Sequence, residues 1–88
     1  MKIKGTFVLR SIMDENVLIP VGDTAAEING MIALNKTGAA VWQGIEAGKT
    51  DDEIIETLVQ RFEVEKSVAK EDYQAFTEGM KAAGILTE

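Results

Sequence analysis

The chain has 88 residues and a formal net charge of −6, and 45% of its residues are hydrophobic while 27% are charged. A chain of this size buries one modest core, so we expect a single soluble globular domain over residues 1–88. The absence of cysteine and histidine excludes disulfides and thiolate metal sites and removes the commonest general base, so we expect neither an enzyme nor a cofactor.

The negative charge is concentrated in the second half of the chain. Residues 1–45 carry four basic and four acidic side chains, whereas residues 46–88 carry five basic and eleven acidic ones. An acidic half is repelled by phosphates, which argues against a nucleic-acid partner. Residues 1–10 lack the apolar core of a secretory signal, and no apolar run is long enough to span a bilayer. We therefore expect a cytoplasmic protein with no membrane partner.

Three β-rich segments come first. Thr6–Ile12 and Asn16–Val21 are apolar runs separated by turn-forming residues around Asp14-Glu15-Asn16, which predicts a hairpin. After the turn signal Gly22-Asp23-Thr24, the segment Ile28–Leu34 predicts a third strand. Within it, Gly30 predicts either a bulge or a place where another backbone comes close, and Met31 projects from the opposite face to the strand's apolar residues.

The next segments predict two helices. Asn35 suits the N-cap of a helix that ends near Glu46, in which Trp42 is the expected core anchor. Thr50 and Glu53 form a capping box, and the apolar stripe behind it predicts a second helix as far as Phe62.

A third helix is predicted from Lys66 to Ala83, where Gly84 stops it and Ile85-Leu86 fold back onto the core. The order of three strands and three helices predicts an α+β domain like a winged helix, with a three-stranded antiparallel sheet covered by helices.

Several short motifs recur in a fixed order along the chain. The strand ending Leu34-Asn35 is followed by Thr37-Gly38 and Trp42, and a helix start follows at Gly48-Lys49-Thr50-Asp51-Asp52-Glu53-Ile54. Both motifs are similar to the pattern of the PqqD family. The last helix resembles the family's in Asp72, Phe76 and the ending Gly84-Ile85-Leu86. The resemblance extends from Phe7 to Leu86 and rests on the order and spacing of motifs that are individually common.

This resemblance implies a peptide chaperone, or recognition element, that binds the leader of a ribosomally made precursor peptide. The leader would be presented to a modifying enzyme, often a radical S-adenosylmethionine maturase. The implied mode is addition of the leader as a β-strand along the third strand, with its apolar side chains in a groove beside the third helix. The implied peptide-binding residues are Ile28, Asn29, Gly30, Met31, Ile32, Ala33, Val68, Ala69, Asp72, Tyr73 and Phe76.

Several of these residues have a simpler structural interpretation. An apolar stripe on a helix is normally buried, so plain core packing is favoured for Phe76 and Met80. For Tyr73 the core and the groove lip are equally favoured. Lys66 and Lys70 are secondary candidates for contacts with an acidic leader, although solvated lysines are the default.

Two alternatives remain open from the sequence. A winged-helix nucleic-acid binder fits the helix order, but the second helix begins with Asp51, Asp52 and Glu53 and carries only one arginine, Arg61. A homodimer is the other, because a free strand edge beside an apolar groove can also pair with itself.

Overall fold

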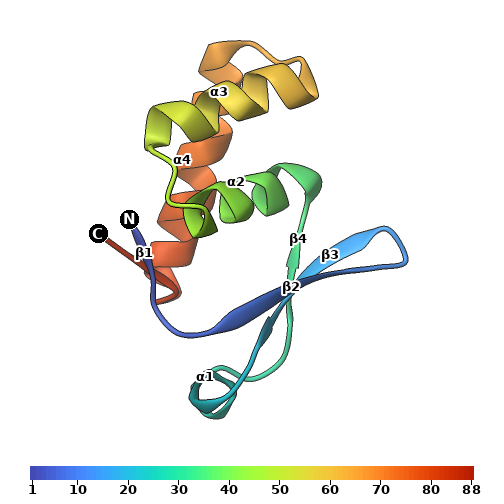
Figure 1. Cartoon of the computed structure of the whole chain (residues 1–88), viewed down its shortest axis with the longest axis vertical. Helices are drawn as coiled ribbons and strands as arrows, with labels where there is room; N and C mark the ends of the chain where they lie inside the picture. The colour runs from blue at the N-terminus through green and yellow to red at the C-terminus, as the bar shows by residue number, and fades with distance from the viewer.

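The first part of the chain forms a three-stranded antiparallel sheet with β3 in the middle (Figure 1). In the computed structural model, which describes residues 1–88, the strands are β2 (Phe7–Ile12), β3 (Glu15–Pro20) and β4 (Ile32–Leu34). Phe7 pairs with Pro20 in β2–β3, and Leu18 pairs with Ile32 in β3–β4. β2 and β4 are therefore the two edges of the sheet, and each has one side without a strand partner.

The predicted hairpin is confirmed, with a tighter turn than residues 14–16 suggested. Met13 and Asp14 alone connect the strands, and their φ angles are +50° and +69°. Two-residue turns with both residues in the left-handed region match the twist of the strands that they join, so Asn16 is left free to pair within β3.

The predicted third strand is wrong in its first half. The chain turns into a short helix, α1 (Asp23–Glu27), and only Ile32–Leu34 pair with β3. The helix lies apart from the other helices at the far end of the sheet, so residues 28–31 are needed as a return connection (Figure 1). Gly30 has a φ of +82° there, a bend that L side chains disfavour and that an extended strand cannot contain.

The three predicted helices are confirmed: α2 (Lys36–Glu46), α3 (Asp51–Phe62) and α4 (Lys66–Ala82). The Asn35 side chain accepts a hydrogen bond of 2.7 Å from the Gly38 amide at the start of α2. At the start of α3, Thr50 and Glu53 each accept from the other's backbone amide, at 3.2 and 2.9 Å. Local capping therefore explains where these two helices begin.

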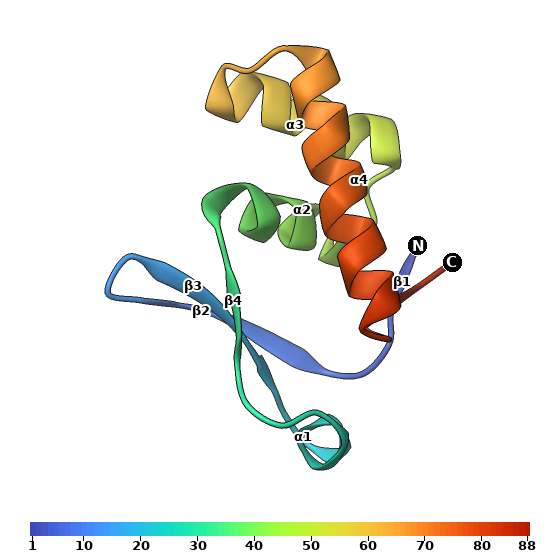
Figure 2. The ribbon, with the colours of Figure 1, turned by 180° about the vertical axis from the view of Figure 1, so that it is seen from behind.

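The two ends of the chain form a second, two-stranded sheet that the sequence did not predict. β1 (Lys2–Ile3) pairs antiparallel with β5 (Leu86–Thr87), so the termini lie side by side (Figures 1 and 2). The predicted fold-back after Gly84 is confirmed, because Ile85 and Leu86 are both buried.

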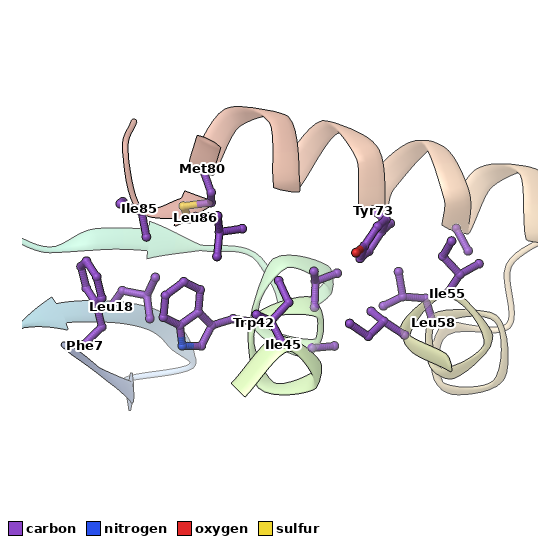
Figure 3. Close-up of a cluster of buried hydrophobic side chains, with 14 residues drawn as sticks. Phe7, Leu18, Trp42, Ile45, Ile55, Leu58, Tyr73, Met80, Ile85 and Leu86 are labelled. Carbon is purple, nitrogen blue, oxygen red and sulfur yellow. The ribbon is translucent and has the colours of Figure 1, made fainter. Parts of the chain in front are cut away.

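The core extends from the inner face of the sheet, across α2, to α3, and α4 runs along it (Figure 3). Trp42 is completely buried, as predicted, and its ring meets that of Phe7 edge to face, with centroids 5.6 Å apart. Leu18 from β3 and Leu58 from α3 complete the two ends of this cluster. No helix of the chain is both long enough and apolar enough to cross a membrane.

Candidate functional site

An apolar groove separates β4 from α4. Its volume is about 450 Å³, and eight of its eleven lining residues are hydrophobic. Figure 2 shows β4 and α4 running in opposite directions, and the groove lies between β4 and the second half of α4, from Ala75 onward. The lining residues are Ile32, Ala33, Leu34, Asn35, Gly38, Ala75, Phe76, Gly79, Met80, Ala83 and Ile85.

The strand side of the groove is an unpaired sheet edge. β4 pairs with β3 on one side only, so part of its main chain has no partner strand. Ala33 is exposed, whereas Ile32 and Leu34 are half-buried and pack against the core. A rigid, core-anchored edge therefore stands directly beside an apolar hollow.

The helix side of the groove is a face made largely of small residues. Ala75, Gly79 and Ala83 are spaced by four residues along α4, which places them one turn apart on the same side. Phe76 and Met80 lie next to this row, and both also pack in or against the core. The short side chains of this row leave the space of the groove open, and the larger side chains of Phe76 and Met80 lie at its border.

The groove continues into a polar hollow at the start of α2. This hollow has a volume of about 330 Å³ and shares Asn35, Gly38, Ala75 and Phe76 with the apolar groove. Thr37 and Asp72 line only the polar hollow, and Asp72 is the one charged residue along the whole groove. The site is therefore apolar at one end and acidic at the other.

The predicted residues of α4 divide between two faces. Asp72 and Phe76 line the groove, and Val68 lies one turn before Asp72 on the same side with 41% of its surface exposed. Ala69 and Tyr73 instead face the core and are buried, so neither lines the groove. One side of α4 faces the groove and the adjacent side faces the core, so residues that are neighbours in sequence have different surroundings.

The predicted residues before and within β4 also divide. Ile32 and Ala33 line the groove. Ile28 is half-buried against the core, whereas Asn29, Gly30 and Met31 are exposed in the connection that leads into β4. An added Cβ at Gly30 would meet nothing within 4 Å, so its positive φ, rather than a close neighbour, explains the glycine.

Sequence reasoning missed several groove residues, among them Ala75, Gly79, Ala83, Asn35 and Gly38. The four-residue spacing of small side chains on α4 was a visible signal. Short side chains on an exposed helix face are nevertheless common, so this spacing becomes informative only once a strand edge is known to lie opposite.

Tyr73 has a structural partner rather than a ligand-facing position. Its hydroxyl donates a hydrogen bond to the carboxylate of Asp51, in the first turn of α3. The pKa of Tyr73 is raised above its ordinary value, mainly by burial of the phenol and secondly by this bond to an anion. The bond ties the middle of α4 to the start of α3.

The other hollows on the surface are more polar than the groove, including one of about 420 Å³ beside the edge strand β2, where three of seven lining residues are hydrophobic. A hollow along α3 contains no hydrophobic residue and is lined by Lys49, Lys66 and the acidic and polar side chains between them in the fold. No three Asp or Glu side chains lie close enough together to hold a metal ion. Lys66 therefore lies beside acidic residues of its own chain and away from the groove.

Comparisons with known proteins agree with this architecture. The family model of coenzyme PQQ synthesis protein D (PqqD) matches residues 12–86. A solved structure described as TbiB1 in complex with the TbiA(beta) leader peptide superposes with a TM-score of 0.75 and 24% sequence identity, over 98% of this chain and 94% of that chain. No curated protein matches the chain. Since the family model spans most of the 88 residues, the chain belongs to the PqqD family.

Proposed function

We propose that this domain binds the leader of a ribosomally synthesised precursor peptide and presents it to a modifying enzyme. The observation that carries the proposal is the apolar groove lying beside the unpaired edge of β4. Membership of the PqqD family supports it, as does the shared fold of a solved structure whose description names a bound leader peptide.

The proposed binding mode is strand addition. The leader pairs through its main chain with Ile32–Leu34, which supplies affinity that is largely independent of sequence. Alternate leader side chains then point into the groove against Phe76 and Met80, which supplies selectivity. Asp72, at the acidic end, is placed to accept hydrogen bonds from a polar or basic leader residue.

The length of β4 limits the paired segment. Three strand residues at a rise of roughly 3.3 Å each cover about 10 Å, so three or four leader residues form the main-chain ladder. The exposed residues Asn29 and Met31 extend the contact surface before β4, where the bend at Gly30 prevents a regular ladder.

The domain's role in this proposal is binding rather than catalysis. The groove holds one carboxylate, Asp72, and no cysteine, histidine, serine or lysine beside it that would complete a catalytic set. The chemistry is then supplied by the partner enzyme, for which a radical S-adenosylmethionine maturase is our candidate.

Self-association through the same edge is the second candidate. An unpaired strand beside an apolar groove can add the β4 of another copy in place of a leader. Light scattering with and without the leader separates the two uses. A dimer that dissociates when the leader is added shows that both compete for this edge.

An amide-resolved NMR titration tests the proposed function. The probe is the leader segment of the precursor peptide encoded next to this chain. Shifts should concentrate at Ile32–Asn35 and at Asp72–Ala83, and the solvent face of α3 should remain unchanged. Saturation without shifts in β4, or shifts confined to α3, would contradict binding in this groove.

A matched variant sharpens the same test. Ala33→Glu places a carboxylate at the exposed edge of the groove without removing a core residue. We expect it to weaken leader binding by about tenfold or more, because a charge must be desolvated against apolar side chains. Ala26→Glu, on the exposed helix α1, is the control and should bind normally.

A further inference from the structure

Three glycines lie inside the helices, and two of them have an intramolecular reason. A Cβ at Gly44 would lie 2.7 Å from Ile54 Cγ1, so glycine there permits α2 and α3 to pack closely. A Cβ at Gly38 would lie 3.1 Å from Asn35 Oδ1 and from the ring of Phe76. At both positions the cost of a helical glycine is offset by close packing.

Gly79 is the exception. An added Cβ there would meet no atom within 4 Å, and the residue is exposed. It also lacks the positive φ of Gly84, the glycine that follows the end of α4, so neither turn geometry nor packing requires a glycine. Glycine lowers helix stability relative to alanine, and the fold of this chain offers nothing in return at this position.

The place of Gly79 in the groove supplies a reason. It lies one turn from Ala75 and one turn from Ala83, with Met80 beside it. Its carbonyl accepts the Ala83 amide at 3.1 Å, so the main chain at Gly79 is engaged within the helix. The space over Gly79 is therefore apolar, without unpaired polar groups, and larger than any other residue would leave it.

We propose that Gly79 is a specificity-determining residue that opens a subsite for one large apolar side chain of the leader. This inference rests on the proposed function and names the chemistry that the groove selects. A leucine-sized or larger side chain fills the space over Gly79 and contacts Met80 and Phe76, removing apolar surface on both sides from water. A charged side chain is disfavoured, because no opposite charge lines the apolar part of the groove.

The test combines variants of Gly79 with an alanine scan of the leader. The probe is again the leader encoded next to this chain, together with peptides in which each residue in turn is alanine. In the wild-type protein one apolar position should dominate the scan. Gly79→Val should weaken binding of the full leader by about tenfold or more, because the added carbons occupy the subsite.

Coupling between the two changes is the decisive readout. The peptide that lacks the dominant apolar side chain should bind Gly79→Val and wild type within about twofold, because neither complex fills the subsite. Gly79→Ala should show an intermediate loss of affinity while raising the melting temperature by about 2–8 °C, which separates binding from folding. Gln74→Val, exposed on another face of α4, is the control and should bind normally.

The outcomes separate this inference from the function on which it rests. If the leader binds all variants equally, Gly79 does not set selectivity, and the function stands while the inference fails. The inference also fails if Gly79→Val weakens every peptide of the scan by the same factor. If the wild-type domain binds no leader peptide, the proposed function fails, and the subsite fails with it.

Discussion

The ring of Phe76 lies directly against Gly38. A Cβ at Gly38 would lie 3.1 Å from both Cδ1 and Cε1 of that ring. The first turn of α2 and the middle of α4 therefore pack closely because residue 38 has no side chain. The contact holds Phe76 half-buried, packed against the core and also lining the groove. Groove shape and core packing therefore depend on the same close approach.

Gly38→Ala should lower both stability and leader affinity. The new methyl group displaces the Phe76 ring, and such overpacking costs about 1–3 kcal/mol against the roughly 1 kcal/mol that alanine contributes to a helix. Urea unfolding and a leader titration measure the two effects. Adding Phe76→Leu should recover part of the stability, since a smaller side chain relieves the contact; equal losses in the single and double variants would contradict this explanation.

Trp42→Ala should unfold the domain rather than alter its selectivity. The indole is fully buried against Phe7 and lines no part of the groove, and such truncations cost about 3–5 kcal/mol. That loss is comparable to the whole stability of a domain this small. Circular dichroism should show the unfolding, whereas a folded Trp42→Ala protein with weakened leader binding would place the indole in the site.

Tyr73→Phe should reduce stability and leave leader binding within about twofold. The substitution removes the hydrogen bond to Asp51, and bonds to charged groups contribute about 1.5–3 kcal/mol. The ring itself stays in the core, away from the groove. Loss of leader affinity in a stably folded Tyr73→Phe protein would return this residue to the binding site.

Alkaline pH tests the combined effect of burial and the Asp51 bond on the Tyr73 hydroxyl. The pKa of Tyr73 is raised in the folded state, so its contribution to stability is complete below its ordinary value of 10.0 and is lost as the pH rises above that value. Between about pH 9 and 11 the wild type should therefore lose more stability than Tyr73→Phe, measured by urea unfolding. Parallel losses in the two proteins would show that burial and the bond to Asp51 do not raise the pKa of Tyr73.

Acid should weaken the start of α3 through Glu53. The pKa of this carboxylate lies below its usual 4.5. The larger cause is the hydrogen bond from the Thr50 backbone amide, and the second is the hydrogen bond with the Thr50 side chain. The contribution to stability is therefore present above that pH and is lost as the pH falls below it. Between about pH 7 and 3, the melting temperature of the Glu53→Gln protein should fall less than that of the wild type. Glutamine keeps the capping box but does not titrate.

Local signals in the sequence were sufficient for the three long helices, α2, α3 and α4, but not for the short helix α1. Asn35, Thr50 and Gly84 mark helix ends through bonds or backbone angles that involve only residues a few positions away, and the structure has the ends where these residues predict them. The hairpin and the burial of Trp42 were equally visible, because alternation and apolar spacing are local patterns.

The third strand was predicted too long because its start depends on distant contacts. Ile28 fits the alternation of Ile32 and Leu34, but α1 lies beyond the end of the sheet and the chain must bend at Gly30 to return. Pairing of Lys2–Ile3 with Leu86–Thr87 escaped prediction for a related reason, since two-residue strands carry no periodicity and form only when the termini are brought together.

The two faces of α4 show what the sequence by itself determined and what required the tertiary structure. Sequence patterns established the helix, its apolar seam and, through family motifs, the expectation of a peptide-binding domain. Only the packing of α4 against α2 and α3 turned Ala69 and Tyr73 into core residues and left Asp72 and Gly79 facing the groove. Helical periodicity determines which residues share a side, but the neighbours that cover each side are set by long-range burial of apolar surface.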